Sequence, residues 1–237
     1  MARALTGLVF LMAASGLFSE TGFPEDTFPA APLGLKLTFL GHATFMIAWG
    51  ETVIHVDPVG QYADYSMLPK ADIVLVTHEH FDHLDPDAIK AIRKADTEVV
   101  LTKNCFAKVP GATVMKNGES RTAKGVGIDA VPAYNLSKTF HPKGIGNGYV
   151  LTLGSRRLYV AGDTECTPEM KALKNIDIAF LPMNLPYTMT PEMVADAALA
   201  FRPKVLYPYH YGETNTAKLV ALLKSAPDIE VRIRPMK

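Results

Sequence analysis

The densest group of chemically reactive side chains in the sequence is the stretch THEHFDHLD, residues 77–85. Three histidines and three acidic residues occupy these nine positions, directly after the apolar run ADIVLV. A solvated surface favours Lys and Glu, and a protein core favours neither histidine nor carboxylate. Histidine with interleaved carboxylate is a ligand set that divalent metals prefer. The stretch therefore predicts a metal site.

The spacing within this stretch separates the donors into two pairs. His78 and His80 alternate by two, which lets both imidazoles converge on one ion from an extended segment or a tight loop. Asp82 and His83 follow on the turn before a helix and can face a second ion beside the first. These ligand types suit zinc, and also iron, manganese or nickel, so they do not name the metal. The alternative is a histidine-rich loop that only caps and hydrogen-bonds, and the density of donors after a buried strand disfavours it.

The elements that must position these residues follow from the periodicity of the chain. Short strands at 35–41, 44–50 and 52–58 are separated by turn residues and predict a meander at a sheet edge. The run ADIVLVT at 71–77 is continuously apolar, which predicts a central strand covered on both faces. Helices are predicted to begin at Asp85–Pro86, Thr167–Pro168 and Thr190–Pro191. Further strands are predicted at 97–102, 127–134, 148–154, 157–163, 176–182, 205–210 and 229–235.

This order is rich in strands, with helices between them, and both halves of the chain contain similar material. We therefore predict an α/β fold in which two sheets pack face to face with helices outside, a four-layer αββα sandwich. With 237 residues and 48% hydrophobic content, the chain can bury a large core. We assign residues 31–237 to one domain and find no convincing short-period repeat.

The charge of the chain is balanced, with 24 basic and 24 acidic residues. Proteins that bind nucleic acid non-specifically rely on a positive footprint, and no cluster of Lys and Arg supplies one here. A module that only binds nucleic acid is therefore disfavoured, and a small molecule or a lipid-like compound is the expected partner.

The first thirty residues differ from the rest of the chain. Arg3 precedes an apolar stretch from Ala4 to Phe18, and no acidic residue occurs before Glu20. Together with the small residues at 14–16, this layout is typical of a secretory signal, and the stretch is too short for a comfortable transmembrane helix. We predict a signal peptide and linker over 1–30, and export to the periplasm or the medium. A frayed amphipathic helix is the alternative, in which case the protein is cytoplasmic.

The chain contains only two cysteines, Cys105 and Cys166. In an oxidising compartment they could pair, but neither their number nor their spacing demands it. No second Cys or His lies close to either in sequence, so we do not predict them as zinc ligands.

Several motifs together resemble those of a known superfamily. HEHFDH resembles the HxHxDH signature of the metallo-β-lactamase superfamily, and LGHATF at 40–45, VDP at 56–58, AGDTE at 161–165 and YPYHYG at 207–212 occur in the order that superfamily uses. The resemblance extends from Leu35 to Lys237 and implies the αββα fold. GHATF, HEHFDHLD and AGDTEC look most like the branch that contains ascorbate-6-phosphate lactonase and N-acyl-phosphatidylethanolamine phospholipase D.

The resemblance also implies a set of metal ligands. His78 and His80 match two ligands of a first metal, and Asp82 and His83 match two ligands of a second. Asp163 matches the aspartate that bridges both metals, and His210 matches the last ligand of the second site. The first site then lacks one histidine between His83 and Asp163, and His141 is the only histidine in that interval. We expect two divalent ions, with zinc favoured over manganese, iron or nickel.

Two histidines are left over. His42 lies in GHATF, on a loop that borders the metal cleft in this fold, and it could contact substrate, orient a ligand or be structural. His55 alternates with apolar neighbours and is interpreted as structural. Asp57 is expected to brace the metal loop through hydrogen bonds. The pattern assigns no role to the remaining polar candidates, which are Tyr134, Asn135, Asn184, Tyr209 and Tyr211.

The ligand set predicts a hydrolase in which metal-bound hydroxide attacks an ester, lactone or phosphodiester. Asp82 is the expected catalytic residue, because it ligates and could also accept or relay a proton. The sequence contains no GxSxG elbow and no cysteine in a catalytic setting, so water is the best nucleophile. Two alternatives stay open, namely an inactive metal-binding or ligand-binding protein on the same fold and a ribonuclease-type phosphodiesterase.

Overall fold

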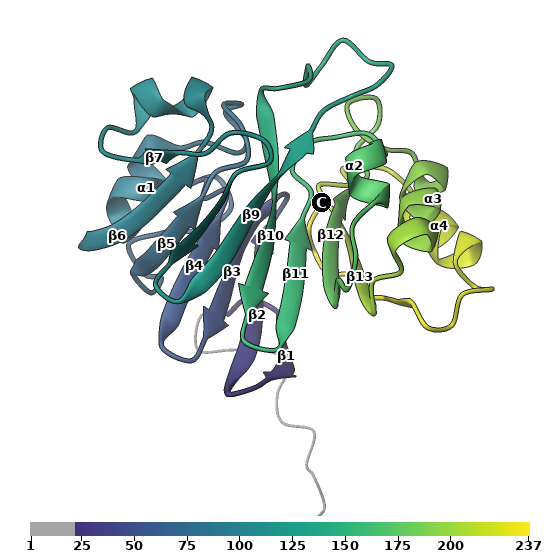
Figure 1. The fold of residues 1–237 in the computed structure, drawn as a ribbon, viewed down its shortest axis with the longest axis horizontal. Coiled ribbons are helices and arrows are strands. Elements are labelled where there is room, and N and C mark those ends of the chain that lie inside the picture. Colours follow the sequence, from purple (N-terminus) through teal and green to yellow (C-terminus); the bar gives the residue numbers. More distant parts are fainter. Residues whose placement is uncertain (1–21) are drawn as a thin grey trace, which may run out of the picture.

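Two seven-stranded sheets lie face to face at the centre of the molecule, as the sequence predicts (Figure 1). The structure is a computed structural model and describes residues 22–237. The strand order is β1-β2-β3-β4-β5-β6-β7 in the first sheet and β14-β13-β12-β11-β10-β9-β8 in the second. Helix α1 lies on the outer side of the first sheet, whereas α3 and α4 lie beyond the second. The four layers of the predicted αββα sandwich are therefore present.

The first sheet begins as an antiparallel meander and continues as parallel strands. Strands β1 to β4 pair antiparallel, and β4 to β7 pair parallel. The central, continuously apolar strand predicted from ADIVLVT is β5, which is hydrogen-bonded on both edges. The bounds are Glu25–Ala30 for β1, Leu33–Gly41 for β2, Thr44–Trp49 for β3, Thr52–Val56 for β4, Ala71–Leu75 for β5, Arg93–Leu101 for β6 and Thr113–Val114 for β7.

The second sheet has the same division into antiparallel and parallel parts. Strands β8 to β11 pair antiparallel, and β11 to β14 pair parallel. Its parallel strands bring their carboxyl ends to one edge, where connecting segments gather. The bounds are Ser120–Ala123 for β8, Val126–Ala133 for β9, Gly146–Leu153 for β10, Arg156–Val160 for β11, Ile178–Pro182 for β12, Val205–Tyr209 for β13 and Glu230–Val231 for β14.

The helices begin where the caps predict. The side chain of Asp85 accepts the first free N–H groups of α1, and Thr167 and Thr190 do the same for α2 and α3. Each of these three helices has proline in its first turn, where a missing N–H costs nothing. The bounds are Pro86–Ile92 for α1, Lys103–Lys108 for the 3-10 helix η1, Pro168–Lys171 for α2, Pro191–Phe201 for α3 and Thr216–Leu222 for α4.

Two predicted elements are shorter than the sequence pattern indicates. The helical pattern continues to residue 95, but α1 ends at Ile92 because Arg93 pairs with Ala71 and starts β6. The apolar alternation at 229–235 predicts a full strand, but β14 spans only two residues. Beyond it the guanidinium groups of Arg232 and Arg234 contact the carboxylate of Asp26, and the N–H of Arg232 still donates to the carbonyl of Leu206 at 2.9 Å.

The N-terminal linker prediction is wrong for residues 25–30. This segment forms β1, and all six residues pair antiparallel with β2. Phe28 explains the difference, because its ring packs against the core between the sheets. The predicted signal peptide falls mostly on residues 1–21, which lie outside the described part of the chain.

The core between the sheets is aromatic near its centre. Phe180 stacks on Phe45, with ring centroids 4.1 Å apart, and on Tyr207 at 4.9 Å. A second apolar cluster joins the second sheet to α3, where Val194, Ala197 and Phe201 are buried. Burying these side chains is the main favourable contribution to holding the layers together. Helix α3 therefore packs against the outer face of the second sheet.

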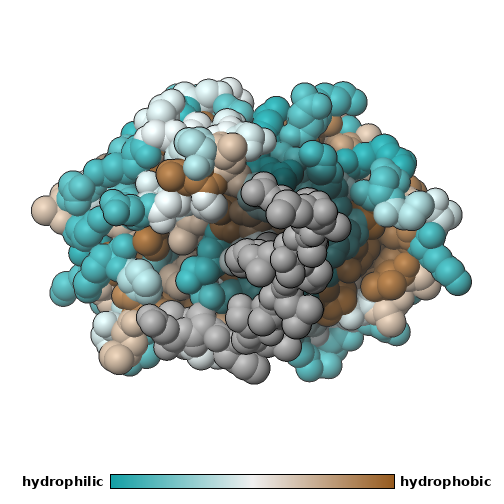
Figure 2. Space-filling view, turned by 90° about the horizontal axis from the view of Figure 1, so that it is seen from below, coloured by the Kyte–Doolittle hydropathy of each residue, from teal (hydrophilic) through white to brown (hydrophobic). Residues whose placement is uncertain are grey.

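The outer surface contains no membrane-spanning helix within residues 22–237, because none of the helices there is long and apolar enough. Figure 2 shows hydrophilic residues over most of one face, with smaller hydrophobic areas between them. Cys105 and Cys166 are both free.

Candidate metal centre

The donor residues lie where strand ends of the two sheets meet. His78 follows β5 of the first sheet, and Asp163 and His210 follow β11 and β13 of the second. Backbone hydrogen bonds join the sheets there, because Asn147 N–H donates to the carbonyl of Thr77 at 2.9 Å and His210 N–H donates to that of His42 at 3.0 Å. The position of the donors is thus fixed by main-chain contacts between sheets.

The first donor group consists of His78, His80 and His141. Nδ1 of His80 lies 3.0 Å from Nε2 of His78 and 3.2 Å from Nε2 of His141. Two nitrogens that bind one tetrahedral ion at about 2.1 Å are separated by roughly 3.4 Å. These three imidazoles therefore have a donor spacing that suits a single ion.

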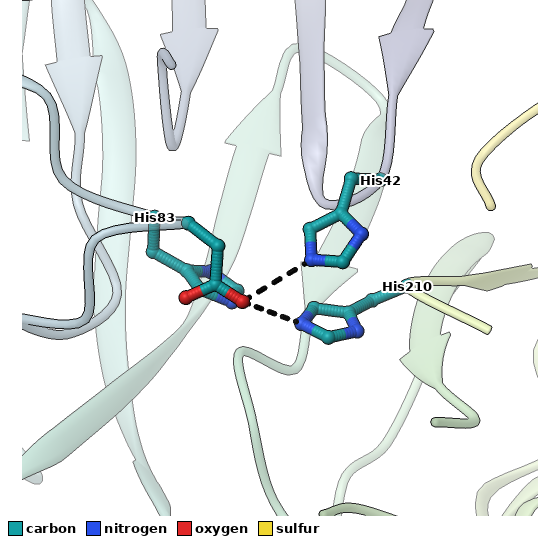
Figure 3. A group of neighbouring side chains, drawn as sticks. His42, His83 and His210 are labelled. Carbon is teal, nitrogen blue, oxygen red and sulfur yellow. Dashed lines mark hydrogen bonds and ion pairs between the residues drawn. The ribbon is translucent and has the colours of Figure 1, made fainter. Parts of the chain in front are cut away.

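The second donor group consists of His42, Asp82, His83 and His210, whose donor atoms lie within 4.8 Å of one another. Oδ2 of Asp82 lies 3.2 Å from Nε2 of His42 and 3.5 Å from Nε2 of His210. Figure 3 shows His42 and His210 approaching from separate elements, with both rings directed at the same carboxylate oxygen.

Asp163 lies between the two groups. Its Oδ2 is 3.3 Å from Nε2 of His141 in the first group and 3.5 Å from Nε2 of His210 in the second, while Oδ1 is 3.5 Å from Nε2 of His83. One carboxylate thus reaches donors of both groups. The preceding Gly162 makes this placement possible, because its φ is +66° and a Cβ there would lie 2.9 Å from the carbonyl oxygen of Asn147.

Several donor atoms are buried without a hydrogen-bond partner, among them Nε2 of His83, Nε2 of His210 and Oδ1 of Asp163. Buried polar atoms are nearly always paired, so a cluster of unpaired ones requires an explanation. All three face the space between the two donor groups. Cations bound there would satisfy them, and the residues present therefore fit divalent metal ions.

The protonation of most donors suits metal binding. Burial lowers the pKa of His78 well below its usual value, and it lowers the pKa of His141 in the same direction. For Asp163, burial acts to raise the pKa, but the neighbouring His210 and His83 outweigh it and hold the pKa well below its usual value. Neutral imidazoles and an ionised carboxylate are the forms that ligate metals.

His83 differs from the other histidines. Burial acts to lower its pKa, but the carboxylates of Asp163 and Asp57 outweigh it and raise the pKa well above the usual value. Nδ1 of His83 lies 2.8 Å from Oδ2 of Asp57, so its Nε2 faces the donors. A cation at Nε2 would replace the proton that the two carboxylates otherwise hold on this ring.

Hydrogen bonds behind the donors fix their orientation. Asp57 accepts from both N–H and Oγ1 of Thr77, at 2.7 Å each, which confirms the expected bracing of the metal loop. The side-chain amides of Asn184 and Asn135 lie 3.1 Å and 3.3 Å from Nδ1 of His210 and His141. A carboxylate behind a histidine, as Asp57 lies behind His83, is a regular feature of metal-binding histidines.

The structure brings together all seven residues that the sequence analysis named as ligands, which are His78, His80, Asp82, His83, His141, Asp163 and His210. It also gives His42, which the pattern left open, a place beside Asp82. His42, Asp57, His141 and His210 are four of the seven non-glycine residues with positive φ in the described chain. Strained backbone of this kind gathers at functional sites.

The sequence analysis missed Glu165, although AGDTE contains it. Its buried carboxylate accepts hydrogen bonds from the N–H groups of Leu136 and Ser137, at 2.6 Å and 2.8 Å, and from Oγ of Ser137 at 2.9 Å. It thereby holds the segment that leads to His141. The available signal was the polar run at 163–167, which contains Asp163, Thr164, Glu165 and Thr167. The hydrogen-bond partners of Glu165 lie too far away in the sequence to be predicted from it.

The remaining candidates have structural contacts. Nε2 of His55 donates to the carbonyl of Pro69 at 3.0 Å in a buried position, which confirms its structural role. The hydroxyl of Tyr134 donates to Glu169, and that of Tyr211 donates to the carbonyl of Arg234. Tyr209 is buried in the core between the sheets.

Comparison with known sequences identifies the superfamily. The profile of a family described as a beta-lactamase superfamily domain matches residues 36–210. A UPF0173 metal-dependent hydrolase of Pelotomaculum thermopropionicum is 31% identical over 221 residues, which cover 84% of this chain and 96% of that protein. The chain therefore belongs to the metallo-β-lactamase superfamily, among its metal-dependent hydrolases.

Solved structures agree with this assignment. A crystal structure from Parabacteroides distasonis, of a protein assigned as a metal-dependent hydrolase, matches with a TM-score of 0.88 and 49% identity, covering 91% of this chain and 100% of that one. A metallo hydrolase of the archaeon Ignicoccus hospitalis matches with a TM-score of 0.72 and 26% identity, covering 86% and 96%. The predicted fold class is thereby confirmed, while the branch within the superfamily stays a prediction.

Proposed function

We propose that the protein hydrolyses a small ester, lactone or phosphodiester with the help of two divalent metal ions. His78, His80 and His141 hold the first ion, Asp82, His83 and His210 hold the second, and Asp163 is shared between them. Zinc is the favoured metal for this mixture of imidazole and carboxylate. Such ions lower the pKa of water and polarise the oxygen of the electrophile.

The observation that carries this proposal is the position of Asp163. A single buried carboxylate lies within 3.5 Å of Nε2 of His83, His141 and His210, and thus contacts histidines of both donor groups. A site that only needed hydrogen bonds would not leave Oδ1 of this residue and Nε2 of two of the histidines unpaired. A shared carboxylate between two sets of donors is what a dinuclear site requires.

Asp82 is placed to move the proton. Burial acts to raise its pKa, but its contacts with His210 and His42 outweigh it and hold the pKa well below its usual range, so the carboxylate is ionised and able to ligate. Both contacts engage Oδ2, which leaves Oδ1 to relay a proton from the attacking water to the leaving group. His42 acts here as a positioning residue that holds the carboxylate through its Nε2.

The size of the adjoining cavity favours small substrates. A cavity of about 330 Å³ is lined by donors of both groups, including His80, Asp82 and His210. This volume is at the lower end of the range for small-molecule sites. Together with the zero net charge, it supports a compact substrate rather than a long polyanion.

The proposal is tested with a panel of lactones, carboxylic esters, phosphodiesters and RNA. Wild-type protein loaded with zinc is expected to turn over at least one small substrate, to lose turnover on chelation and to regain it with Zn²⁺ or Mn²⁺. Asp82→Asn is expected to lower kcat by about 100-fold or more where metal content is retained, because general acid–base catalysis typically contributes that much. Asp87→Asn, an exposed carboxylate in the first turn of α1, is the matched control.

Three outcomes would count against the proposal. Cleavage of RNA with no turnover of small substrates would favour a ribonuclease. A fully metallated wild type that binds ligands but hydrolyses nothing would favour a binding protein. If Asp82→Asn and wild type had equal kcat at equal metal content, the proton-transfer role assigned to Asp82 would be refuted.

A further inference from the structure

The cavity beside the donors has an aromatic wall, which we define as Phe81, Phe140 and Tyr187. Apart from the donors and Asn184, these three residues complete its lining. Each is exposed, with Phe81 at 80%, Phe140 at 45% and Tyr187 at 42%. Large apolar side chains that gather in the open at one cavity usually mark a binding site rather than random surface.

Two of the three rings of the aromatic wall, Phe140 and Tyr187, are held in place. The rings of Phe140 and Tyr187 meet edge to face, with centroids 5.1 Å apart and an interplanar angle of 73°. The side-chain amide of Asn135 donates to the carbonyl of Tyr187 at 2.8 Å, and the ammonium group of Lys138 donates to that of Thr188. The segment that carries Phe140 and the segment that carries Tyr187 are therefore joined by two hydrogen bonds as well as by their rings.

The segment that carries Phe140 is also held by Glu165. Glu165 accepts from the backbone of Leu136 and Ser137, as described above, and its carboxylate lies 3.5 Å from Nζ of Lys138. The backbone N–H of Asn135 donates to the carbonyl of His141 at 2.9 Å, which closes the segment on itself. A wall built in this way is in place before substrate arrives, which reduces the ordering cost of binding.

The charge of the cavity lining excludes one kind of substrate group. Among the described residues that line it, none is Lys or Arg. Lys138, in the adjoining segment, is already engaged by Thr188 and Glu165. An anionic group placed against the aromatic wall, away from the two ions that the donors would hold, would lose its hydration without gaining a cation, so the part of the substrate that packs there is uncharged.

From this arrangement we propose that the substrate is a carboxylic ester or lactone with an apolar acyl group, either an aromatic ring or a chain of medium length, that packs against Phe81, Phe140 and Tyr187. This inference rests on the proposed function and narrows its substrate class. Water adds to the carbonyl carbon, the bond from that carbon to the leaving oxygen breaks, and the proton lost by water ends on that oxygen. The products are a carboxylic acid with an apolar tail and an alcohol from an ester, or a single hydroxy acid from a lactone.

The test uses the product acids as probes, so that it does not depend on turnover. Straight-chain carboxylates from acetate to octanoate are titrated into zinc-loaded protein by calorimetry. The Kd is expected to fall by about fourfold for each methylene that reaches the aromatic wall. In Phe140→Ala the affinity for octanoate is expected to fall at least about fivefold, while that for acetate stays within about twofold.

Phe106→Ala is the matched control. Phe106 is exposed to the same 45% but lies on η1 and does not line the cavity, so this variant should bind all the acids as wild type does. The inference is overturned if wild type binds octanoate no better than acetate, or if Phe140→Ala weakens both acids equally.

Parallel kinetics with esters of the same acids separate this inference from the proposed function. If longer acids bind more tightly but no ester is hydrolysed, the apolar site is retained and the hydrolase function is refuted. If all esters are hydrolysed with the same kcat/KM and longer acids bind no more tightly, the hydrolase function is retained and the apolar site is refuted.

Discussion

The two donor groups differ in composition and in depth. The first has three imidazoles, one of which, His80, is exposed, and it has no carboxylate of its own beyond the shared Asp163. The second contains Asp82 in addition, and its His83 and His210 are buried. A divalent cation therefore meets more negative charge and less water in the second group, so we expect the second ion to bind more tightly.

The two groups also differ in what supports them. His141 of the first group lies on a loop that Glu165 holds through side-chain hydrogen bonds. The second group is joined by the backbone bond from His210 to His42 and by the Asp57 carboxylate behind His83. This difference indicates that the same protein can have one ion site fixed by the sheets and another that depends on a loop.

The largest effect is expected from Asp163→Asn, because this residue alone serves both groups. Loss of a supporting residue behind a metal ligand typically costs 10- to 100-fold in metal affinity, so loss of a shared ligand should cost more than about 100-fold at each site. Metal analysis after dialysis should show both ions depleted, and turnover should fall with them. Retention of two equivalents with unchanged activity would refute the shared role.

Asp57→Asn and Glu165→Gln should separate the two groups. Asp57→Asn should weaken the second ion by about 10- to 100-fold, because it removes the charge that orients His83. Its effect on the first ion should be smaller, because Asp57 reaches His78 only through Thr77, whose Oγ1 lies 3.0 Å from Nδ1 of His78. Glu165→Gln should weaken mainly the first ion, because it loosens the segment before His141. Stepwise titration with Co²⁺, followed by its visible spectrum, measures the two affinities.

Asp72→Asn is the control for this pair of variants, since Asp72 binds Lys94 and the backbone of Val53 away from the donors. If both variants weakened the same ion, the two groups would not be independently supported, and the comparison between them would fail.

The smallest effect on metal binding is expected for His55, a buried histidine outside both groups, which acts on the stability of the fold instead. Burial lowers its pKa to about 4, and the bond to the carbonyl of Pro69 offsets only part of this shift. Since the unfolded chain binds this proton near pH 6.5, stability should fall as the pH drops from about 6.5 to 4, by about 3 kcal/mol in total. Urea unfolding of metal-free wild type and His55→Gln at several pH values should show a weaker pH dependence for the variant, whose side chain does not titrate.

The sequence predicts the parts of the site that are local. HEHFDH places four donors within six consecutive positions, and the capping residues before Pro86 and Pro168 set where the neighbouring helices begin. Strands β2 to β5 were also predictable, because β5 lies in a continuous apolar run and β2 to β4 are separated by short turns. The segment at 25–30 was wrongly predicted as a linker. It forms a strand because its backbone pairs with β2, and amino-acid composition does not reveal such pairing.

Contacts between distant segments could not be predicted in the same way. His42 and Asp82 are forty positions apart and meet only because the strand ends of the two sheets converge. The aromatic wall likewise depends on two loops whose joining bonds involve backbone carbonyls, which every residue possesses. Patterns of residue type therefore identify the donors but not the surface that receives the substrate.

The left-handed backbone at His42, Asp57, His141 and His210 bears on how this fold can evolve. For a non-glycine residue this conformation costs about 1 kcal/mol, which glycine would not incur. Replacement by glycine at such a position relieves backbone strain while it removes a donor or its support. Selection for folding alone would therefore not preserve these side chains. A homologue that no longer needed the chemistry of the site would lose the metal centre before it lost the αββα fold.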